Sequence, residues 1–305
     1  MRIESPYLQS ADALWLRGNL HTHTCRSDGM LSPQQAIRAY AGLGHDFLGL
    51  SDHNTPPALD GLDDCGMLLI PANEISGSCG HLLSLGFESA TEPETHQQAL
   101  IDTVASSGGM AVLCHPNWGT TFNHYAYETM EALSGYHAIE IYNGSIEEDP
   151  GSPYALDKWD RLLATGRRVW GMANDDAHSP GGQGRGMCVV RAAERTPAAV
   201  IQALMDGSFY ASTGARIESI EVSGSRLLLR APEAEAILVI GEAGRRLEVV
   251  TGGTLDFDAR GVEGSVLRVE VFGSAGRRAW TQPFILKRLE PDPEGMRLAV
   301  EPSSA

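Results

Sequence analysis

The 305-residue sequence lacks long hydrophobic runs, basic clusters and regularly spaced cysteine pairs. No stretch approaches the roughly 20 apolar residues that a helix needs to cross a bilayer. The N-terminus also has no continuous apolar segment of the kind that secretory signals contain. Five cysteines, an odd number without CxxC spacing, fit reduced thiols better than a disulfide framework. We therefore expect a cytoplasmic protein that does not contact the membrane.

Positive charge is scarce, since 23 Lys and Arg residues stand against 39 Asp and Glu residues for a formal net charge of −16. Without a basic stripe to follow a phosphate backbone, the chain is a poor candidate for binding polymeric nucleic acid. The excess of acid also repels small anions at long range. An anionic small-molecule substrate would therefore need local positive charge, which bound divalent cations would supply.

Short apolar runs alternate with helical patterns over residues 1–214, which is typical of repeated βα units with a mostly parallel sheet. Helical stretches at 32–44, 91–109 and 152–166 end at glycine, and two of them start with Ser-Pro, as a capped helix does. The apolar runs are 16–21, 47–52, 67–73, 81–87, 110–115, 138–143, 168–174 and 186–192. This alternation predicts an α/β fold with a closed or nearly closed barrel.

From residue 215 the pattern changes to alternating strands that are separated by glycine-containing turns. We expect residues 215–287 to form a small antiparallel β-sandwich domain. The polar, Pro-rich stretch 288–305 is expected to be a flexible tail. The sequence of this region contains no motif that indicates a catalytic or metal-binding role of its own. An exposed sandwich edge would suit the pairing of two copies into a homo-oligomer.

Histidines and carboxylates recur where the apolar runs begin or end. His21 and His23 close the first run, and their i, i+2 spacing places both on one face of a strand. Asp176 and His178 repeat this spacing after residues 168–174. The remaining members of this set are Asp28, His53, Glu74, His81 and His115. Because the carboxyl ends of barrel strands gather on one face, we expect these side chains to meet there.

Any one of these histidines alone is more often a structural residue, but that interpretation does not explain the whole set. Imidazole and carboxylate groups without cysteine suit Mn, Fe or Zn, whereas pure oxygen ligation would suit Mg or Ca. Nine groups are too many for one ion, so two or three divalent ions would share them through a bridging carboxylate. We interpret the other histidines, which fall in helical or loop contexts, as structural or surface residues. They are His45, His96, His124 and His137.

These motifs resemble the polymerase and histidinol phosphatase (PHP) superfamily. The matching segments, in the family's order, are LHTHTCRSDG (20–29), LSDHNT (50–55), NEISG (73–77), GHLLSLGF (80–87), CHPNW (114–118) and DDAHS (175–179). The resemblance implies a distorted (β/α)7-type barrel with a complete set of nine ligands. One ion would be held by His21, His23, Glu74 and Asp176, a second by Glu74, His81 and His115, and a third by Asp28, His53 and His178.

Two further points follow from the resemblance. The doublet Asp175-Asp176 leaves two registers, of which the DxH match favours Asp176. The closing segments, GRGMCVV and TPAAVIQALMDGSFYASTG before a β-rich region, are similar to a metallohydrolase branch that carries a C-terminal sandwich. That branch includes carbamate and ester hydrolases beside phosphoesterases, so the resemblance fixes the fold more firmly than the substrate.

A metal-bound hydroxide is the expected nucleophile, because divalent metals lower the pKa of bound water to about 7. In a phosphoesterase a guanidinium would neutralise the remaining phosphate charge. Arg185, in the Gly-rich loop after the DxH motif, is the first candidate for this role, and Arg26 is the second. Either His178 or Asp176 would protonate the leaving group.

Asn117 and Trp118 follow the His-Pro pair and are expected to line the substrate pocket, although a packing role for Trp118 is equally compatible. Three functions are open. The favoured one is a phosphoesterase that acts on a small phosphorylated metabolite or nucleotide. The alternative is a carbamate, ester or amide hydrolase that uses the same metal cluster. A non-enzymatic binding module is disfavoured by the complete ligand set.

Overall fold

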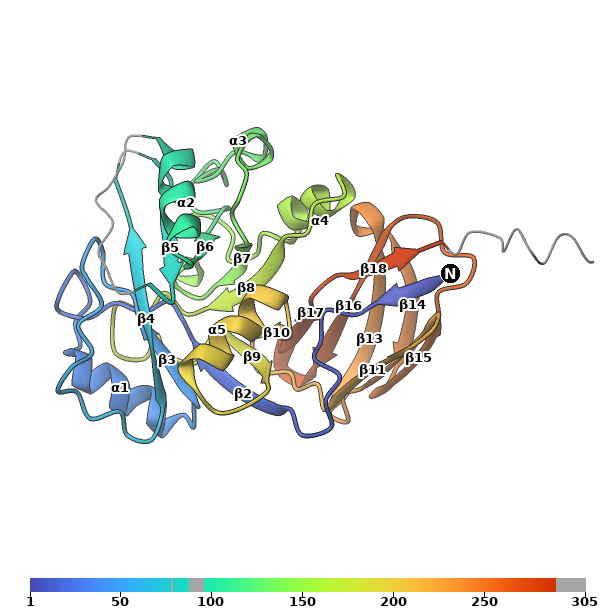
Figure 1. Cartoon of the computed structure of the whole chain (residues 1–305), viewed down its shortest axis with the longest axis horizontal. Helices are drawn as coiled ribbons and strands as arrows, with labels where there is room; N and C mark the ends of the chain where they lie inside the picture. Colours follow the sequence, from blue (N-terminus) through green and yellow to red (C-terminus); the bar gives the residue numbers. More distant parts are fainter. Residues whose placement is uncertain (78, 88–95, 289–305) are drawn as a thin grey trace, which may run out of the picture.

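The computed structural model describes residues 1–77, 79–87 and 96–288. Their fold is mixed α/β, with one large central sheet that continues into an all-β C-terminal part (Figure 1). The strands of its N-terminal part are β2 (Leu14–Asn19), β3 (Phe47–Leu50), β4 (Leu68–Ile75), β5 (Leu82–Leu85), β6 (Met110–Leu113), β7 (Ala138–Asn143), β8 (Trp170–Asn174) and β9 (Met187–Ala192). They are hydrogen-bonded neighbours in the order β9-β2-β3-β4-β5-β6-β7-β8. All eight predicted apolar runs are confirmed as strands.

The directions of these strands bring the candidate site residues to one edge. Neighbours are parallel from β2 to β4 and from β6 to β8, but β5 is antiparallel to both β4 and β6. The first residue of β5 therefore lies at the same edge as the last residues of the parallel strands. This reversal explains why His81 precedes its strand while the other histidines follow theirs.

The predicted barrel is not confirmed. Among the described residues, no regular ladder joins β8 to β2. The two strands are linked just beyond their ends by an isolated parallel bridge between Thr22 and Ala177. In this link the Asp176 N–H donates to the His21 carbonyl at 2.8 Å, and the His23 N–H donates to the Ala177 carbonyl at 3.0 Å. The contact between β8 and β2 is thus confined to the edge that carries the candidate site.

Within the described part of the chain, five α-helices accompany the strands: α1 (Pro33–Gly42), α2 (Gln97–Ser106), α3 (Tyr127–Ala132), α4 (Leu156–Ala164) and α5 (Pro197–Asp206). The cap of α1 is as predicted. Ser32 and Gln35 form a reciprocal capping box, and Pro33 between them is the first residue of the helix. The Ser-Pro prediction for α4 is wrong. That helix begins only at Leu156, because the Ser152 hydroxyl instead accepts from the Tyr154 N–H. None of the described helices is long and apolar enough to cross a membrane.

The C-terminal part contains β10 (Phe209–Ser212), β11 (Ser219–Ser223), β12 (Arg226–Arg230), β13 (Ala234–Gly241), β14 (Arg246–Thr251), β15 (Thr254–Asp258), β16 (Val266–Gly273), β17 (Arg278–Thr281) and β18 (Phe284–Lys287). The sheet β11-β12-β15 packs on β13 and β16–β18 through a core that includes Leu227, Leu255, Val269 and Phe284. Two antiparallel layers therefore enclose one apolar cluster.

The domain boundary at residues 214 and 215 stays a prediction. The large sheet crosses it, since β10 pairs with both β9 and β17. The N-terminal strand β1 (Arg2–Glu4) pairs with β18, so the start of the chain lies among the C-terminal strands (Figure 1). Of the predicted tail 288–305, residues 289–305 lie outside the described part of the chain.

A buried ion cluster ties α4 to the sandwich. The Arg268 guanidinium, in β16, donates to both Asp160 oxygens at 2.7 and 2.8 Å and to Glu270 at 2.6 Å, and it lies over the Trp159 ring. Arg268 is only 3% exposed. These groups are satisfied as a set, so the removal of one member leaves buried charge uncompensated.

We predict that Arg268→Met lowers the free energy of unfolding by about 3–5 kcal/mol, because it leaves Asp160 and Glu270 without their cation. Urea denaturation measures the change. Arg226→Met is the matched control, since Arg226 pairs with Asp256 on the exposed face of the sandwich. Equal, small effects of both substitutions would contradict a stabilising role for the buried cluster.

Candidate metal centre

The candidate site is built around the carboxylate of Glu74, which lies near the end of β4 and is 1% exposed. Five histidines from four segments point a ring nitrogen at this group, since His21 and His23 follow the same strand. Glu74 Oε2 lies 3.1 Å from His21 Nε2, 3.2 Å from His23 Nε2 and 3.2 Å from His53 Nδ1, and Oε1 lies 3.0 Å from His81 Nδ1 and 3.1 Å from His115 Nε2. Both oxygens of one carboxylate thus face histidines.

Asp176 completes a compact set of four groups on one side of Glu74. Its Oδ1 lies 3.2 Å from His21 Nε2 and 3.0 Å from His23 Nε2. The backbone of Asp176 is left-handed, with φ = 53°, and that of His115 is as well, with φ = 32°. Such conformations cost non-glycine residues of order 1–3 kcal/mol and are found where a functional geometry requires them.

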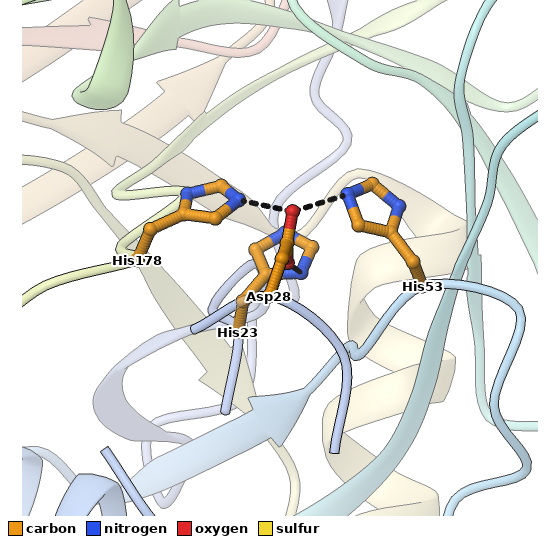
Figure 2. Close-up of side chains that lie close together, drawn as sticks. All are labelled: His23, Asp28, His53 and His178. Atoms are coloured by element: carbon orange, nitrogen blue, oxygen red, sulfur yellow. Dashed lines mark ion pairs between the residues drawn. The ribbon is translucent and has the colours of Figure 1, made fainter. Parts of the chain in front are cut away.

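A second cluster surrounds Asp28 (Figure 2). Asp28 Oδ2 lies 3.5 Å from His53 Nε2 and 3.5 Å from His178 Nε2, while its Oδ1 lies 3.5 Å from His23 Nδ1. The loop that carries Asp28 packs tightly on the strand end, because a Cβ atom on Gly29 would lie 2.4 Å from the His23 backbone. All nine predicted ligand residues are therefore brought together.

Several buried polar atoms in this cluster have no hydrogen-bond partner among the described residues. They are Nε2 of His21, both ring nitrogens of His23, Nδ1 of His53, Nδ1 of His115 and Oδ1 of Asp176. An unsatisfied buried polar group costs about 1–3 kcal/mol, so a cluster of them is unfavourable unless a ligand engages them. Facing imidazole and carboxylate groups 3.0–3.5 Å apart are what divalent cations bind. The donor set fits such ions.

The charge balance of the cluster leads to the same conclusion. Burial alone would raise the pKa of Glu74, yet the surrounding histidines hold it well below its usual range. Burial lowers the pKa of His23, but Asp176 and Glu74 more than reverse this and raise it to about 9. The buried carboxylates thus favour positive charge on their neighbours. Divalent cations would supply that charge without protonating the histidines.

The predicted substrate residues are only partly in position. A cavity of about 390 Å³ lies over the cluster, and Trp118 and Arg185 both line it. The Arg185 guanidinium is already engaged by Glu148 and by the Gly144 carbonyl. Arg26 and Asn117 are not among the described lining residues.

Arg26 and Asn117 have other contacts. Arg26 is exposed and donates to the Ala58 carbonyl at 2.7 Å. The Asn117 amide turns away from the cavity and donates to the Tyr154 carbonyl and to Asp157. The structure therefore places both side chains as loop braces, and it does not support the predicted pocket role.

Sequence reasoning missed Glu140, in the middle of β7. Its Oε1 accepts from His21 Nδ1 at 2.8 Å and from Asn174, and its Oε2 accepts from the His115 N–H at 2.8 Å and from Asn143. An acidic residue inside the otherwise apolar run AIEIY was the available signal. Glu140 thus orients the His21 ring and holds the backbone of His115, and both of these histidines face Glu74.

His124 was interpreted as structural or surface, and it lies directly beside the site. Its Nε2 accepts from the His81 N–H at 3.0 Å, and its ring packs between His115 and Trp118. Burial, together with His115 and His81, lowers its pKa to about 3, so the ring is neutral and can accept. The structural interpretation holds, but the surface one is wrong.

The two aspartates at positions 175 and 176 have different roles. The Asp175 carboxylate accepts from the Gly186 N–H at 2.6 Å, the Gly184 N–H at 2.7 Å and the Tyr40 hydroxyl at 2.8 Å. It therefore organises the loop that carries Arg185, whereas Asp176 faces the histidines. This geometry agrees with the register that the DxH match favours.

No protein-family model and no curated protein sequence matches this chain. Among solved structures, a two-domain protein from Bacteroides vulgatus ATCC 8482, which contains a predicted PHP-like metal-dependent phosphoesterase, matches with a TM-score of 0.53. The match covers 94% of this chain and 98% of that one at 18% identity. The two chains therefore share a fold.

Two further solved structures are more distant. An amidohydrolase from Chromobacterium violaceum has a TM-score of 0.40 and 18% identity over 54% of this chain and 88% of that one. The lesion-specific endonuclease PfuEndoQ from Pyrococcus furiosus has a TM-score of 0.45 and 13% identity over 75% of this chain and 62% of that one. Neither similarity is close enough to bear on the site.

The register of the doublet can be tested with two substitutions. Asp176→Asn should remove most bound divalent metal, because it neutralises an oxygen that faces His21 and His23. Asp175→Asn should leave the metal content intact but lower the free energy of unfolding by about 1–3 kcal/mol, since an amide NH2 would then face an N–H donor. Elemental analysis and urea denaturation measure the two effects, and the reverse pattern would assign the site to Asp175.

Proposed function

We propose that this chain is a hydrolase that depends on two or three divalent metal ions, and that these ions are Mn, Fe or Zn. The observation that carries the proposal is the convergence of nine His, Asp and Glu side chains, with unpartnered buried nitrogens, on Glu74 and Asp28. His21, His23, Glu74 and Asp176 would hold one ion. Glu74, His81 and His115 would hold a second, and Asp28, His53 and His178 would hold a third.

Bound divalent cations would supply two kinds of chemistry here, by activating water near neutral pH and by polarising an oxygen of the scissile group. The protein's own contribution is to orient the ligands and to exclude competing protons. Glu74 supports this role because each of its oxygens faces a different group of histidines. Glu74 would therefore contribute to the sites of both of the first two ions.

His178 is the better candidate for protonating the leaving group. Its Nδ1–H donates to the Asp176 carbonyl at 2.8 Å, and its Nε2 faces Asp28 at the cavity. If only the first two ions bind, Nε2 is not a metal ligand and would carry the proton for the leaving group. Its side chain is 34% exposed, whereas that of Asp176 is 7% exposed. Asp176 faces His21 and His23 through Oδ1 and accepts from Asn143 through Oδ2. Its oxygens are therefore committed to the cluster.

Charge along the cavity favours a substrate with a single phosphate. The described lining residues include six carboxylates, namely Asp28, Glu74, Glu148, Asp149, Asp175 and Asp176, and one arginine, Arg185. Two or three divalent ions would roughly neutralise this wall and would leave little positive charge for a second anionic group. We therefore propose a phosphoesterase for a small phosphorylated metabolite or nucleotide, in line with the predicted activity of the Bacteroides vulgatus protein.

One observation favours the alternative, which is hydrolysis of a carbamate, ester or amide. Arg185 is paired with Glu148, so its guanidinium is not free to receive a phosphate unless this ion pair opens. A neutral carbonyl substrate would not need that change. The same metal ions would serve either reaction.

A substrate panel separates these activities. Protein reconstituted with Mn, Fe or Zn should release phosphate from aryl phosphates and mononucleotides, and bisphosphorylated analogues should react more slowly. Aryl carbamates and esters form the second arm of the panel. His53→Ala should lower kcat/KM by at least about 100-fold and reduce the metal content, since mutations at such ligands remove transition-state stabilisation.

His96→Ala is the matched control, because His96 is exposed and makes no capping hydrogen bond. Hydrolysis of carbamates or esters without phosphate release would select the alternative. A protein that binds metal but hydrolyses neither class would be a binding module. Unchanged metal content in His53→Ala would contradict the proposed cluster.

Glu140 provides an independent test of the metal proposal. Glu140→Gln should weaken metal binding by about 10–100-fold, because the partner that orients His21 through its Nδ1–H loses its charge. Titration with a competing chelator measures this affinity. If the affinity remains that of the unmodified protein, His21 is not a ligand whose orientation matters.

A further inference from the structure

The loop of residues 116–125, called here the 116–125 loop, forms one wall of the cavity. It follows His115 and carries Trp118 and His124, whose rings pack against His115 with centroid distances of 5.2 and 4.7 Å. Trp118 lines the cavity directly. The position of this loop therefore sets the shape of the substrate space beside the candidate metal centre.

Lys158, in α4, lies behind this loop. The chain contains only two lysines, Lys158 and Lys287, beside 21 arginines, and Lys158 is the buried one at 5% exposure. Its Nζ donates to the carbonyl oxygens of Pro116 at 2.9 Å, Phe122 at 3.0 Å and Tyr125. The side-chain oxygen of Asn123 is also within 3.5 Å. The ammonium thus joins both ends of the loop and its middle.

No carboxylate of the described chain forms an ion pair with Lys158. An ammonium has three donors, and here each finds a backbone carbonyl. A buried charge is costly unless hydrogen bonds compensate it, so the carbonyl cage is what makes the position tolerable. Burial lowers the pKa of Lys158, as expected for an amine in this setting.

The loop has a conformation that needs such support. Phe122 is 51% exposed and has a left-handed backbone with φ = 54°, which is unfavourable for a non-glycine residue. Its carbonyl is one of the three that Lys158 binds. Without the ammonium, three carbonyl dipoles would point at one another across a buried space. The clamp therefore offsets both strain and repulsion.

The same helix also contacts the sandwich. Asp157 accepts from the Asn117 amide of the loop at 2.9 Å, and Asp160 pairs with Arg268 of β16. In Figure 1, α4 lies between β7 and the C-terminal strands. One short helix thus binds the cavity loop through Asp157 and Lys158 and the sandwich through Asp160.

We propose that Lys158 is a positioning residue that clamps the 116–125 loop and keeps Trp118 on the cavity wall, with α4 linking this loop to the sandwich. The catalytic consequence rests on the proposed hydrolase function. The clamp itself does not. Substrate fit, rather than metal binding, is the property that Lys158 controls.

Three full-length variants test this inference kinetically. Lys158→Ala should raise KM by about 10-fold or more, since small displacements of positioning groups are costly, while kcat and metal content change little. Propylammonium, which replaces the missing atoms, should restore KM, whereas propanol should not. Lys158→Arg should retain part of the function. Arg161→Met is the control, because Arg161 is exposed on the same helix and lies over the Tyr127 ring.

An unchanged KM in Lys158→Ala, or equal rescue by propanol, would overturn the proposal. Loss of metal together with activity would assign Lys158 a general structural role instead, and would overturn it as well.

Two measurements need no activity, and the first of them also needs no variant. Amine acetylation of the native protein should modify Lys287 and the N-terminus but spare Lys158 until the protein unfolds. Hydrogen exchange should be faster in residues 116–125 of Lys158→Arg than in the same residues of Arg161→Met. Modification of Lys158 at the rate of Lys287 would overturn the clamp, whereas failure of every substrate with a protected Lys158 would overturn only the proposed function.

Discussion

The structure depends on one buried carboxylate. Glu74 receives ring nitrogens from His21, His23, His53, His81 and His115 at 3.0–3.2 Å, and these histidines come from strand ends that are far apart in sequence. Five imidazoles around a buried carboxylate satisfy one another poorly as hydrogen-bond partners, as their unpartnered nitrogens show. As a set of metal ligands they are complementary. This contrast is the physical basis for proposing a metal centre.

The groups around the centre serve mainly to hold its loops and rings. Asp52 accepts from the Thr24 N–H and hydroxyl and from Ser27, and so shapes the segment that carries Asp28. Asp175 does the same for the loop before β9, and Glu140 orients the His21 ring. Among the described carboxylates, Asp28, Glu74 and Asp176 face the candidate ligand nitrogens, whereas Glu140 contacts the other ring nitrogen of His21. The remaining buried carboxylates near the centre hold the loops and the His21 ring in place.

The convergence of the nine candidate ligands was predictable because it depends on a regular feature, the ends of strands. Apolar runs define the strands, and polar residues just beyond them must gather at one edge. His81 fits this rule because β5 is reversed. Side-chain direction within loops has no comparable regularity. Arg26 and Asn117 lie beside ligands in sequence but turn toward Ala58 and Asp157, since loop backbone conformation and distant neighbours decide where they point.

Non-local pairing was also beyond the sequence pattern. The pairing of β1 with β18 joins the two ends of the described chain, and no periodicity in either segment predicts its partner. Lys158 is a similar case. Nothing in its helical pattern distinguishes it from a solvated side chain, and only the packing of α4 against the 116–125 loop reveals a buried ammonium.

The most direct test of the central claim is the metal content of purified protein with and without the Glu74 carboxylate. Elemental analysis should find two or three divalent ions per chain in the unmodified protein. Glu74→Gln should retain at most one, held by Asp28, His53 and His178. Glu148→Gln, which alters an exposed carboxylate of the same cavity, should retain them all. A metal content that is unchanged in Glu74→Gln, or no tightly bound metal in the unmodified protein, would contradict the account.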